Sequence, residues 1–405
     1  MRIAVAFAWA WLAICISAIA ARASPDAITL AVLDDMSGPF ADIQGPGDVV
    51  AVKMAVEDFG GTVLGRPIVV LSSDHQNKAD VGSAIARHWI DVDRVDVILG
   101  LGNSAVALAV QEIARRTRTI DIATSAATSD LTQQACSPYG VHWVFDTYAL
   151  AKGAVTALAR QGQTDWFFLT ADYAYGHAME QDAATIVRAT GGRVVGSVLH
   201  PLDTQDFSSF LLQAQSSPAH VLGFANAGSD LVNSIKQAAE FRLGAGGKRM
   251  VAFAAQLANI HAIGLEAAQG LMFVEAFYWD QTPETRAFSA RFAARRGRPP
   301  TMMQAGIYGA AMHYLKSVKA AGTDESDAVM AQMRKLRIND FMTQDGWIRA
   351  DGRVMRDMYL LRAKSPAQSR GEWDLLEVLA RIPAEDAFRP ASESQCAMLR
   401  DGAGR

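Results

Sequence analysis

Short apolar runs alternate with amphipathic segments along most of this chain. The first run, 28–33, is apolar on both faces, and an amphipathic segment follows it over 49–59. An unbroken apolar run of this length is typical of a strand in a covered parallel sheet, and the helical spacing after it predicts a helix. Between them, Ser37-Gly-Pro and Gly45-Pro-Gly interrupt both patterns. The sequence therefore predicts a buried strand, a polar loop and a helix.

The same rhythm repeats through the first two thirds of the chain. The further predicted strands are 68–71, 95–99, 119–122, 141–145, 166–169, 194–198, 221–224, 250–253 and 271–274, with helical patterns between them. Strands that alternate with helices at this spacing form βαβ units and a parallel sheet. We interpret the pattern as two doubly wound α/β lobes, with the chain crossing between them at 145–148.

The last third has a different pattern. It is helical over 284–295, 303–320 and 324–336, and turn signals around Trp347 then bracket two short strands. The rhythm alone would make this third a separate helical piece.

The N-terminus has the three parts of an export signal. Arg2 precedes an uncharged stretch of 19 residues, 3–21, which ends at Ala21-Arg22-Ala23. A basic start, an apolar core and an A-x-A site predict a signal peptide cleaved after Ala23, and hence a periplasmic location. The alternative is an uncleaved membrane anchor, because a stretch of this length can just span a bilayer.

Charge and cysteine content narrow the function classes. The chain has 38 basic and 42 acidic residues, and a nucleic-acid binder would need a basic face that this scatter does not supply. Cys136 and Cys396 are the two cysteines beyond the leader, and in an oxidising compartment they have one connectivity. The alternative is two unrelated free thiols. We expect the disulfide.

One loop has the form of a dinucleotide-binding motif. The segment Gly100-Leu-Gly102-Asn103-Ser104-Ala105 follows a predicted strand and opens a helix, and Asp121 lies about 20 residues further on. However, Asp121 falls inside the strand 119–122, whereas a ribose-binding acid belongs at a strand's carboxyl end. The same backbone geometry can capture a carboxylate with free N–H groups and the positive end of the helix dipole. We favour anion capture, without a nucleotide or any other cofactor.

Several segments together resemble a known family. Ile28-Thr-Leu-Ala-Val-Leu, Ser37-Gly-Pro-Phe-Ala, the Gly45-rich helix start and Ala55-Val-Glu-Asp-Phe-Gly-Gly are similar to the first unit of periplasmic solute-binding proteins of the branched-chain amino acid type. The resemblance implies a type I periplasmic binding protein fold whose lobes close around a ligand and present it to an ABC permease. It places the first lobe at 24–145 plus about 276–343, the second at 146–275 plus about 344–382, and a tail at 383–405.

The resemblance also assigns candidate ligand contacts in the first lobe. In this family, two small-residue loops grip the carboxylate of the substrate, and the matching positions here are Asn103, Ser104, Ala126, Ala127 and Thr128. Without the resemblance, Thr128 would be an ordinary helix cap.

Aromatic and amide side chains follow the strands of the second lobe. They are Tyr173, Tyr175, Asn226 and Gln256, and Phe40 and Tyr148 are further candidates for ring contacts or for packing near the crossing. Branched-chain amino acid binders usually place a carboxylate in this region for the ligand ammonium, so a neutral aromatic wall resembles the subgroup that binds lignin-derived benzoates. Whether Asp172 or Asp230 faces the cleft stays open.

Enzyme motifs are absent from the sequence. It contains no G-x-S-x-G, P-loop, C-x-x-C or metal-spaced histidine pair, although a hydrolase assembled in space would not need them. We therefore expect an exported, monomeric binding protein for a small carboxylate, with no metal. The alternatives are an amino-acid binder, a ligand-sensing subunit of a receptor and, more remotely, a hydrolase.

Overall fold

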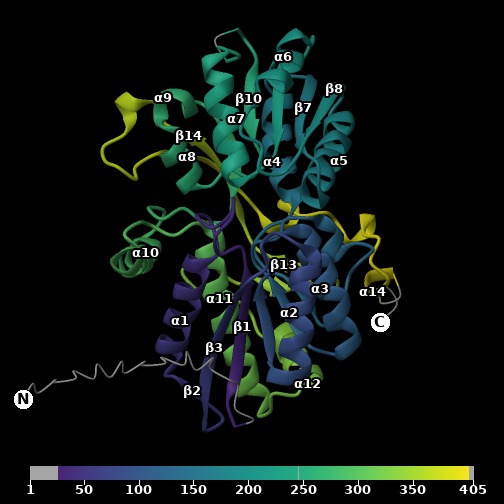
Figure 1. Ribbon diagram of the computed structural model, residues 1–405, viewed down its shortest axis with the longest axis vertical. Helices are drawn as coiled ribbons and strands as arrows, with labels where there is room; N and C mark the ends of the chain where they lie inside the picture. Colours follow the sequence, from purple (N-terminus) through teal and green to yellow (C-terminus); the bar gives the residue numbers. More distant parts are fainter. Residues whose placement is uncertain (1–25, 245, 401–405) are drawn as a thin grey trace, which may run out of the picture.

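The protein consists of two α/β lobes stacked along its long axis (Figure 1). The computed structural model describes residues 26–244 and 246–400. The expected signal peptide, 1–23, and its cleavage site lie outside these residues. Every strand expected in the first two thirds of the chain has a counterpart in the structure, which confirms the two doubly wound sheets.

The first lobe is built on a mostly parallel sheet. Its described strands, in the order β2-β3-β1-β4-β5-β6, are β1 (Ile28–Asp34), β2 (Thr62–Val63), β3 (Arg66–Asp74), β4 (Val97–Gly100), β5 (Ile120–Ala123) and β6 (Gly140–His142). β2 and β3 form an antiparallel hairpin, and the other pairs are parallel. On β1, Leu30 and Val32 face one core cluster and Ala31 and Leu33 the other, which explains why this strand is apolar on both faces.

The second lobe repeats this plan with an antiparallel extension. Its described strands, in the order β15-β14-β11-β10-β9-β7-β8, are β7 (Asp165–Ala171), β8 (Arg193–His200), β9 (Val221–Ala225), β10 (Arg249–Ala252), β11 (Met272–Glu275), β14 (Met358–Ala363) and β15 (Leu376–Ile382). The strands from β7 to β11 pair in parallel, whereas β14 and β15 are antiparallel.

Helices cover both faces of each sheet. The described α-helices are α1 (Pro46–Phe59), α2 (Ala79–His88), α3 (Ser104–Thr117), α4 (Thr147–Ala159), α5 (Ala174–Ala189), α6 (Ser208–Ser216), α7 (Gly228–Glu240), α8 (Leu257–Ile263), α9 (Leu265–Ala268), α10 (Pro283–Arg296), α11 (Met302–Ala321), α12 (Ser326–Lys335), α13 (Ala384–Ala387) and α14 (Ala397–Arg400). The long helix α11 starts at a capping box formed by Thr301 and Gln304 and stops at Gly322 in a left-handed conformation. It packs against α1, so this late helix belongs to the first lobe (Figure 1).

The strand orders fix where a ligand site can lie. The chain goes from β1 to β3 on one side and to β4 on the other, and from β7 to β8 on one side and β9 on the other. Crevices form at the carboxyl ends of strands where the order reverses in this way. The loops after β1, β4 and β5 therefore face those after β7, β9 and β10.

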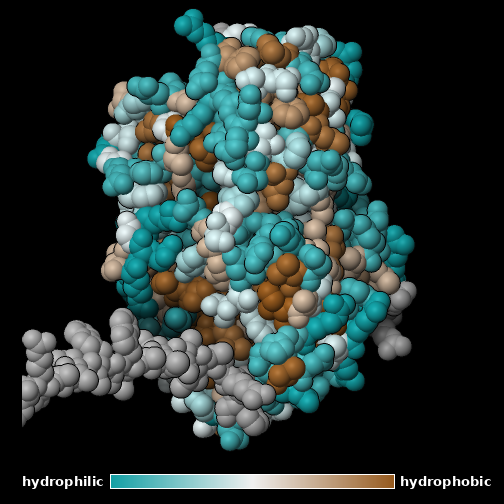
Figure 2. All heavy atoms as spheres, viewed as in Figure 1, coloured by the Kyte–Doolittle hydropathy of each residue, from teal (hydrophilic) through white to brown (hydrophobic). Residues whose placement is uncertain are grey.

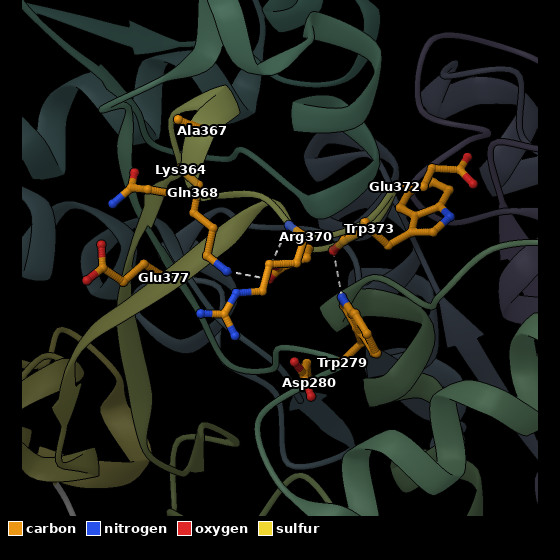
Figure 3. Close-up of a pocket in the computed structure, with 11 residues that line it drawn as sticks. Trp279, Asp280, Lys364, Ala367, Gln368, Arg370, Glu372, Trp373 and Glu377 are labelled. Atoms are coloured by element: carbon orange, nitrogen blue, oxygen red, sulfur yellow. Dashed lines mark hydrogen bonds and ion pairs between the residues drawn. The ribbon is translucent and has the colours of Figure 1, made fainter.

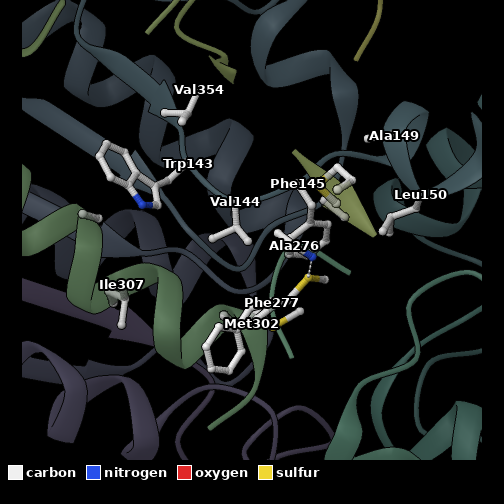
Figure 4. Packing of buried hydrophobic residues seen from close by; sticks show 14 of the residues in the cluster. Trp143, Val144, Phe145, Ala149, Leu150, Ala276, Phe277, Met302, Ile307 and Val354 are labelled. Carbon is white, nitrogen blue, oxygen red and sulfur yellow. Dashed lines mark hydrogen bonds between the residues drawn. The ribbon is translucent and has the colours of Figure 1, made fainter. Parts of the chain in front are cut away.

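Large apolar side chains fill the region where the chain crosses between the lobes (Figure 4). Trp143 and Phe145 lie directly after β6, and Phe277 follows β11; all three are buried. The Ala276 N–H points at the Met302 sulfur, 3.3 Å away. The crossings are thus packed as one core beneath the cleft.

A short hairpin departs from the expected division of the chain. β12 (Trp347–Ile348) and β13 (Val354–Met355) pair with each other, and Arg353 bridges His142 at the end of β6. The His142 N–H donates to the Gly352 carbonyl over 2.9 Å. The sequence placed this hairpin in the second lobe, whereas these contacts join it to the first. The hairpin comes just before β14, a strand of the second lobe, so sequence order alone did not indicate that it contacts the first lobe.

The C-terminal tail runs from the second lobe back to the first. After β15, Arg389 pairs with Asp182 on α5 over 2.5 Å, and Cys396 forms a disulfide with Cys136. The structure thereby confirms the expected pairing. Arg389 also lies 4.5 Å from the centre of the Tyr148 ring, a cation–π distance.

The exterior mixes polar and scattered apolar residues. Figure 2 shows hydrophobic patches among hydrophilic residues on both lobes, and the large exposed apolar side chains are Leu64, Val92, Leu199, Leu212, Val378 and Leu379. Within the part of the chain that the structure describes, no helix is long and apolar enough to span a membrane.

The disulfide yields a stability prediction. Cys136 and Cys396 are 260 residues apart, so removing the bond with Cys396→Ser should release a large loop and lower the free energy of unfolding by up to about 5 kcal/mol. Intact-mass analysis with and without reduction tests the bond, and urea titration measures its effect. Two alkylatable thiols in protein exported under oxidising conditions would contradict the prediction.

Candidate functional site

A small cavity lies between the lobes at the carboxyl ends of the central strands. Its volume is about 20 Å³, and the lining residues are Phe40, Ile43, Gln44, Gly102, Ser104, Ser125, Ala127, Phe145, Tyr173, Tyr175, Ala227, Ala254 and Met303. Such a volume holds about one water molecule, whereas benzene needs about 150 Å³. Any larger ligand therefore requires the lobes or the lining side chains to move apart.

Aromatic rings from both lobes meet at this cavity. Phe40 stacks on Tyr173 with ring centres 6.4 Å apart, and Tyr173 contacts Tyr175 at 5.8 Å. Beside them, the Ser229 N–H donates to the Pro39 carbonyl over 3.1 Å. The two lobes are thus in direct contact across the site.

The first-lobe loops expected to bind an anion are joined by a hydrogen bond. Asn103 caps α3, accepting from the N–H groups of Ala105 and Val106. Ser104, the first residue of α3, accepts the Thr128 N–H on Oγ over 3.2 Å. Its own hydroxyl proton remains available at the positive end of the helix dipole.

Two buried carboxyl groups lie behind this wall. Asp34 accepts the Gly102 N–H over 2.9 Å, and Asp48 accepts the Ser125 hydroxyl over 3.2 Å. Both are fully buried, and their side chains bond to each other. Burial raises the pKa of Asp34 well above its usual range and that of Asp48 to about 7. Because two adjacent buried carboxylates cannot both ionise, the pair keeps a proton.

Asp35, the residue after Asp34, shapes the loop that carries Phe40. Asp35 accepts the N–H groups of Gly38 over 2.6 Å and Phe40 over 2.9 Å, and the Asn77 amide over 2.7 Å. Asp34 and Asp35, the consecutive acids at the end of β1, thus have separate structural roles.

Five of the expected contacts line the cavity, and six do not. Those at the cavity are Phe40, Ser104, Ala127, Tyr173 and Tyr175. Those away from its lining are Asn103, Ala126, Thr128, Tyr148, Asn226 and Gln256.

Each of the six makes another contact within the protein, through its backbone or its side chain. Asn103 is the cap of α3, and Thr128 accepts the Asp130 N–H at 3.4 Å in the same way. The Ala126 carbonyl is 2.8 Å from a ring nitrogen of His142, and Tyr148 lies under Arg389.

The two second-lobe amides turn into their own lobe. The Asn226 amide nitrogen is 3.2 Å from both His200 Nε2 and Ser234 Oγ. Gln256 is the N-cap residue of α8, where its backbone N–H donates to Asn259 Oδ1 over 3.0 Å; its fully buried side-chain amide has no hydrogen-bond partner among the described residues. Neither side chain extends the polar wall of the cavity in this conformation.

Sequence reasoning missed part of the lining. Those residues are Ile43, Gln44, Gly102, Ser125, Phe145, Ala227, Ala254 and Met303. Gly102 and Ser125 stand within the two loops already singled out, so their position was an available signal. Met303 follows a helix start far along the chain, and no local pattern indicates its partner.

The aspartates left open by the sequence take different directions. Asp172 is 2.9 Å from His177 at the surface, where its side chain is 55% exposed. Asp230, in the first turn of α7, accepts the Asp203 N–H over 3.1 Å. Burial raises the pKa of Asp230 to about 7, and its Oδ1 has no hydrogen-bond partner among the described residues.

The glycines of the dinucleotide-like motif have local explanations. Gly100 has a φ of +95°, and a Cβ atom there would lie 2.2 Å from Asp34 Oδ2. Asp121 is buried inside β5 rather than at the strand's end. Over 26–244 and 246–400, no group of three or more His, Cys, Asp or Glu side chains could hold a metal ion.

A larger hollow of about 840 Å³ lies on the outer side of the second lobe (Figure 3). Part of its charged and aromatic lining is paired within the protein: Lys364 bonds Asp374, and the Trp279 indole donates to the Trp373 carbonyl over 2.9 Å. None of its described lining residues belongs to the facing loops after β1, β4, β5, β7, β9 and β10. The interlobe cavity is therefore the better candidate.

Comparisons with known proteins agree with this geometry. A family model described as "Periplasmic binding protein" matches residues 27–371. A periplasmic binding protein of Burkholderia mallei has 46% identity and a TM-score of 0.91, covering 93% of this chain and 100% of its own. A Burkholderia xenovorans structure, described as a branched chain amino acid ABC transporter periplasmic ligand-binding protein, has 40% identity and a TM-score of 0.83, with 92% and 100% covered. "Leu/Ile/Val-binding protein homolog 6" of Brucella melitensis is 24% identical over 78% of this chain and 81% of its own length.

The chain belongs to the periplasmic binding protein family. This is a family of periplasmic solute-binding proteins, which bind small molecules and work with ABC transporter permeases. The lobes, the crevice and the facing loops described above are the parts that such binding uses.

The acid pair predicts an unusual pH dependence. Asp48 has a folded pKa of about 7, above the unfolded value of about 3.9, so its proton stabilises the fold at low pH and this stability is lost as pH rises towards 7. The unfolding free energy of the wild type should therefore fall as pH rises from 5 to 7.5. In Asp48→Asn this fall should be smaller by on the order of 2–3 kcal/mol. Urea titration across this range measures it.

A matched control is Asp172→Asn, at an exposed carboxylate, which should keep the wild-type slope. Parallel pH profiles for wild type and Asp48→Asn would show that the pair holds no extra proton.

Proposed function

We propose that this protein captures an aromatic carboxylate between its lobes and delivers it to an ABC importer. The observation that carries the proposal is the composition of the interlobe cavity. Rings from both lobes face each other across it, a helix start lies at one end, and no acidic side chain is among its described lining residues.

The aromatic walls favour a planar apolar ligand. Phe40 comes from the first lobe and Tyr173 from the second, and their nearly parallel planes, 29° apart, match the faces of an inserted ring. Opening the lobes would separate these rings, and closing them on a ligand would stack both against it. Only the closed state makes contacts from both sides, so binding shifts the equilibrium towards it.

The carboxylate would bind at the first-lobe end. Ser104 offers a hydroxyl proton there, and the α3 dipole favours negative charge. No cation is needed, since hydrogen bonds from neutral groups can hold a carboxylate at a helix start.

The fold occurs with both ligand classes. A solute-binding protein of Rhodopseudomonas palustris BisB5, described in complex with 3,4-dihydroxy benzoic acid, has a TM-score of 0.78 at 22% identity. A leucine binding protein of Thermotoga maritima has the same TM-score at 20% identity. At such identities the likeness concerns the fold, so the choice of ligand rests on the cavity.

The second candidate is an amino-acid binder. Asp230 favours it, because this buried acid influences Tyr173 electrostatically and has an unpaired oxygen. A ligand ammonium would need such a partner once buried. Asp230 lies outside the lining of the cavity, however, and its other oxygen is bonded to Asp203, so we prefer the aromatic acid.

The proposal includes export and a monomeric state. A leader cleaved after Ala23 would deliver the chain to the periplasm, where a permease could receive the closed form. A ligand-sensing subunit would use the same pocket with a receptor as its partner, and co-purification with a permease would distinguish the two roles.

A thermal-shift panel tests the ligand class. At 100 times its dissociation constant, a bound ligand adds about 2.7 kcal/mol, which raises the melting temperature by a few degrees. We expect stabilisation by 4-hydroxybenzoate or a related benzoate or cinnamate, and none by leucine or valine. Stabilisation by leucine alone would instead support the amino-acid binder.

A pair of variants tests the anion end of the site. Ser104→Ala removes a charge-assisted hydrogen bond of about 1.5–3 kcal/mol, so affinity for the stabilising acid should fall by roughly one to two decades. Thr128→Ala is the control, because its side chain caps the turn after β5 and lies away from the cavity. Calorimetric titration gives both affinities. Wild-type binding by Ser104→Ala would place the carboxylate elsewhere.

A further inference from the structure

Gln44 is a buried residue of the cavity wall whose side-chain amide nitrogen is unpaired. It lies in the loop between β1 and α1, its side chain is 1% exposed, and it lines the cavity together with Ser104. Its Nε2 has no hydrogen-bond partner within the described part of the chain. Buried amides are normally paired, because leaving one unpaired costs its full desolvation energy.

The position of Gln44 is fixed by its surroundings. Its N–H donates to the Phe40 carbonyl over 3.2 Å, and its own carbonyl accepts the Gly47 N–H over 3.2 Å and the Gln304 amide over 3.4 Å. Its side-chain amide lies against Gly102, where a Cβ atom would be 2.0 Å from Oε1 and 2.1 Å from Nε2. The glycine is therefore required for this amide to occupy its place.

Neighbouring polar groups on this wall are already committed within the protein. The Gly102 N–H goes to Asp34, the Ser125 hydroxyl to Asp48, and the Thr128 N–H to Ser104. Two side-chain donors, Gln44 Nε2 and the Ser104 hydroxyl, remain for a ligand at the same end of the cavity. Two donors side by side match the two oxygens of a carboxylate.

We propose that Gln44 is a ligand-contacting, specificity-determining residue whose Nε2 donates to one carboxylate oxygen of the ligand while Ser104 donates to the other. The inference rests on the proposed function in requiring a ligand carboxylate, but it does not depend on whether the rest of the ligand is aromatic. The neutral amide also matters for selectivity, because an acidic side chain at this position would disfavour the carboxylate of the ligand.

The test is the preference for an acid over its amide. Gln44→Glu replaces a donor with a charged acceptor of nearly the same size. Its affinity for 4-hydroxybenzoate at pH 7 should fall by at least about 100-fold, because the dry site can hold two carboxyl groups only if one is protonated, and protonating a carboxyl with an ordinary pKa of about 4.3 at this pH is costly. Affinity for 4-hydroxybenzamide should change by less than about tenfold, because the amide N–H can donate to the new carboxylate. The acid-to-amide affinity ratio should therefore drop by at least about tenfold.

Two further variants separate this role from a structural one. Gln44→Met removes the donor at similar volume and should lower the affinity for 4-hydroxybenzoate by about 10- to 100-fold, so it also serves if Gln44→Glu does not fold. Gln213→Glu is the matched control. It makes the same change from amide to carboxylate on the exposed face of α6, away from the cavity, so the ratio should stay at the wild-type value.

The outcomes distinguish this inference from the ligand class. If wild type binds leucine and no aromatic acid, the proposed ligand class fails, and the same ratio is measured with leucine and leucinamide. An unchanged ratio in Gln44→Glu, with either pair, overturns the role of Gln44. A wild-type protein that binds none of the benzoates, cinnamates and amino acids of the panel overturns both proposals.

Discussion

The hydrogen bonds accepted by Asp34 and Asp35 at the end of β1 hold the first-lobe half of the cavity together. Asp34 fixes the loop after β4 through the Gly102 N–H, and Asp35 fixes the loop that carries Phe40. Because Asp34 is buried beside Asp48, burial and the neighbouring acid raise its pKa, and the pair retains a proton. The wall that faces a ligand is thus neutral although acids support it. Under the proposed function, this separation is what lets a carboxylate approach a region rich in aspartate.

The repeating part of the fold could be predicted from the sequence because its signals are local. The apolar run of β1 and those of the later central strands are long enough to identify, and their order predicts the strand-reversal points. The positions of the loops at these points followed directly from this order. Four residues expected in these loops line the cavity: Ser104, Ala127, Tyr173 and Tyr175. Predicting that α11 belongs to the first lobe required the family resemblance, because no pattern within that helix indicates which element it packs against.

The remaining site residues depend on side-chain direction, which no pattern along the chain records. Asn226 follows β9 at the edge of the sheet that faces the cavity. Its amide nitrogen nevertheless points into its own lobe, where it contacts His200 and Ser234. Gln44 shows the opposite case. It resembles an ordinary loop residue in the sequence, and only the absence of a side chain at Gly102 brings its amide to the cavity. Similarly, the hairpin around Arg353 joins the first lobe through a strand more than two hundred residues earlier in the chain.

The C-terminal tail changes what kind of motion the lobes can make. The chain passes between them near Phe145, near Phe277 and again between β13 and β14, and the tail returns from β15 to the first lobe, where Cys396 is bonded to Cys136. Backbone and disulfide together form a closed covalent ring that threads both lobes. Any large translation of one lobe away from the other must stretch these connections, whereas rotation about an axis near the crossings leaves their lengths nearly unchanged. The covalent path thus favours rotation over translation as the way the cleft opens, before any ligand is present.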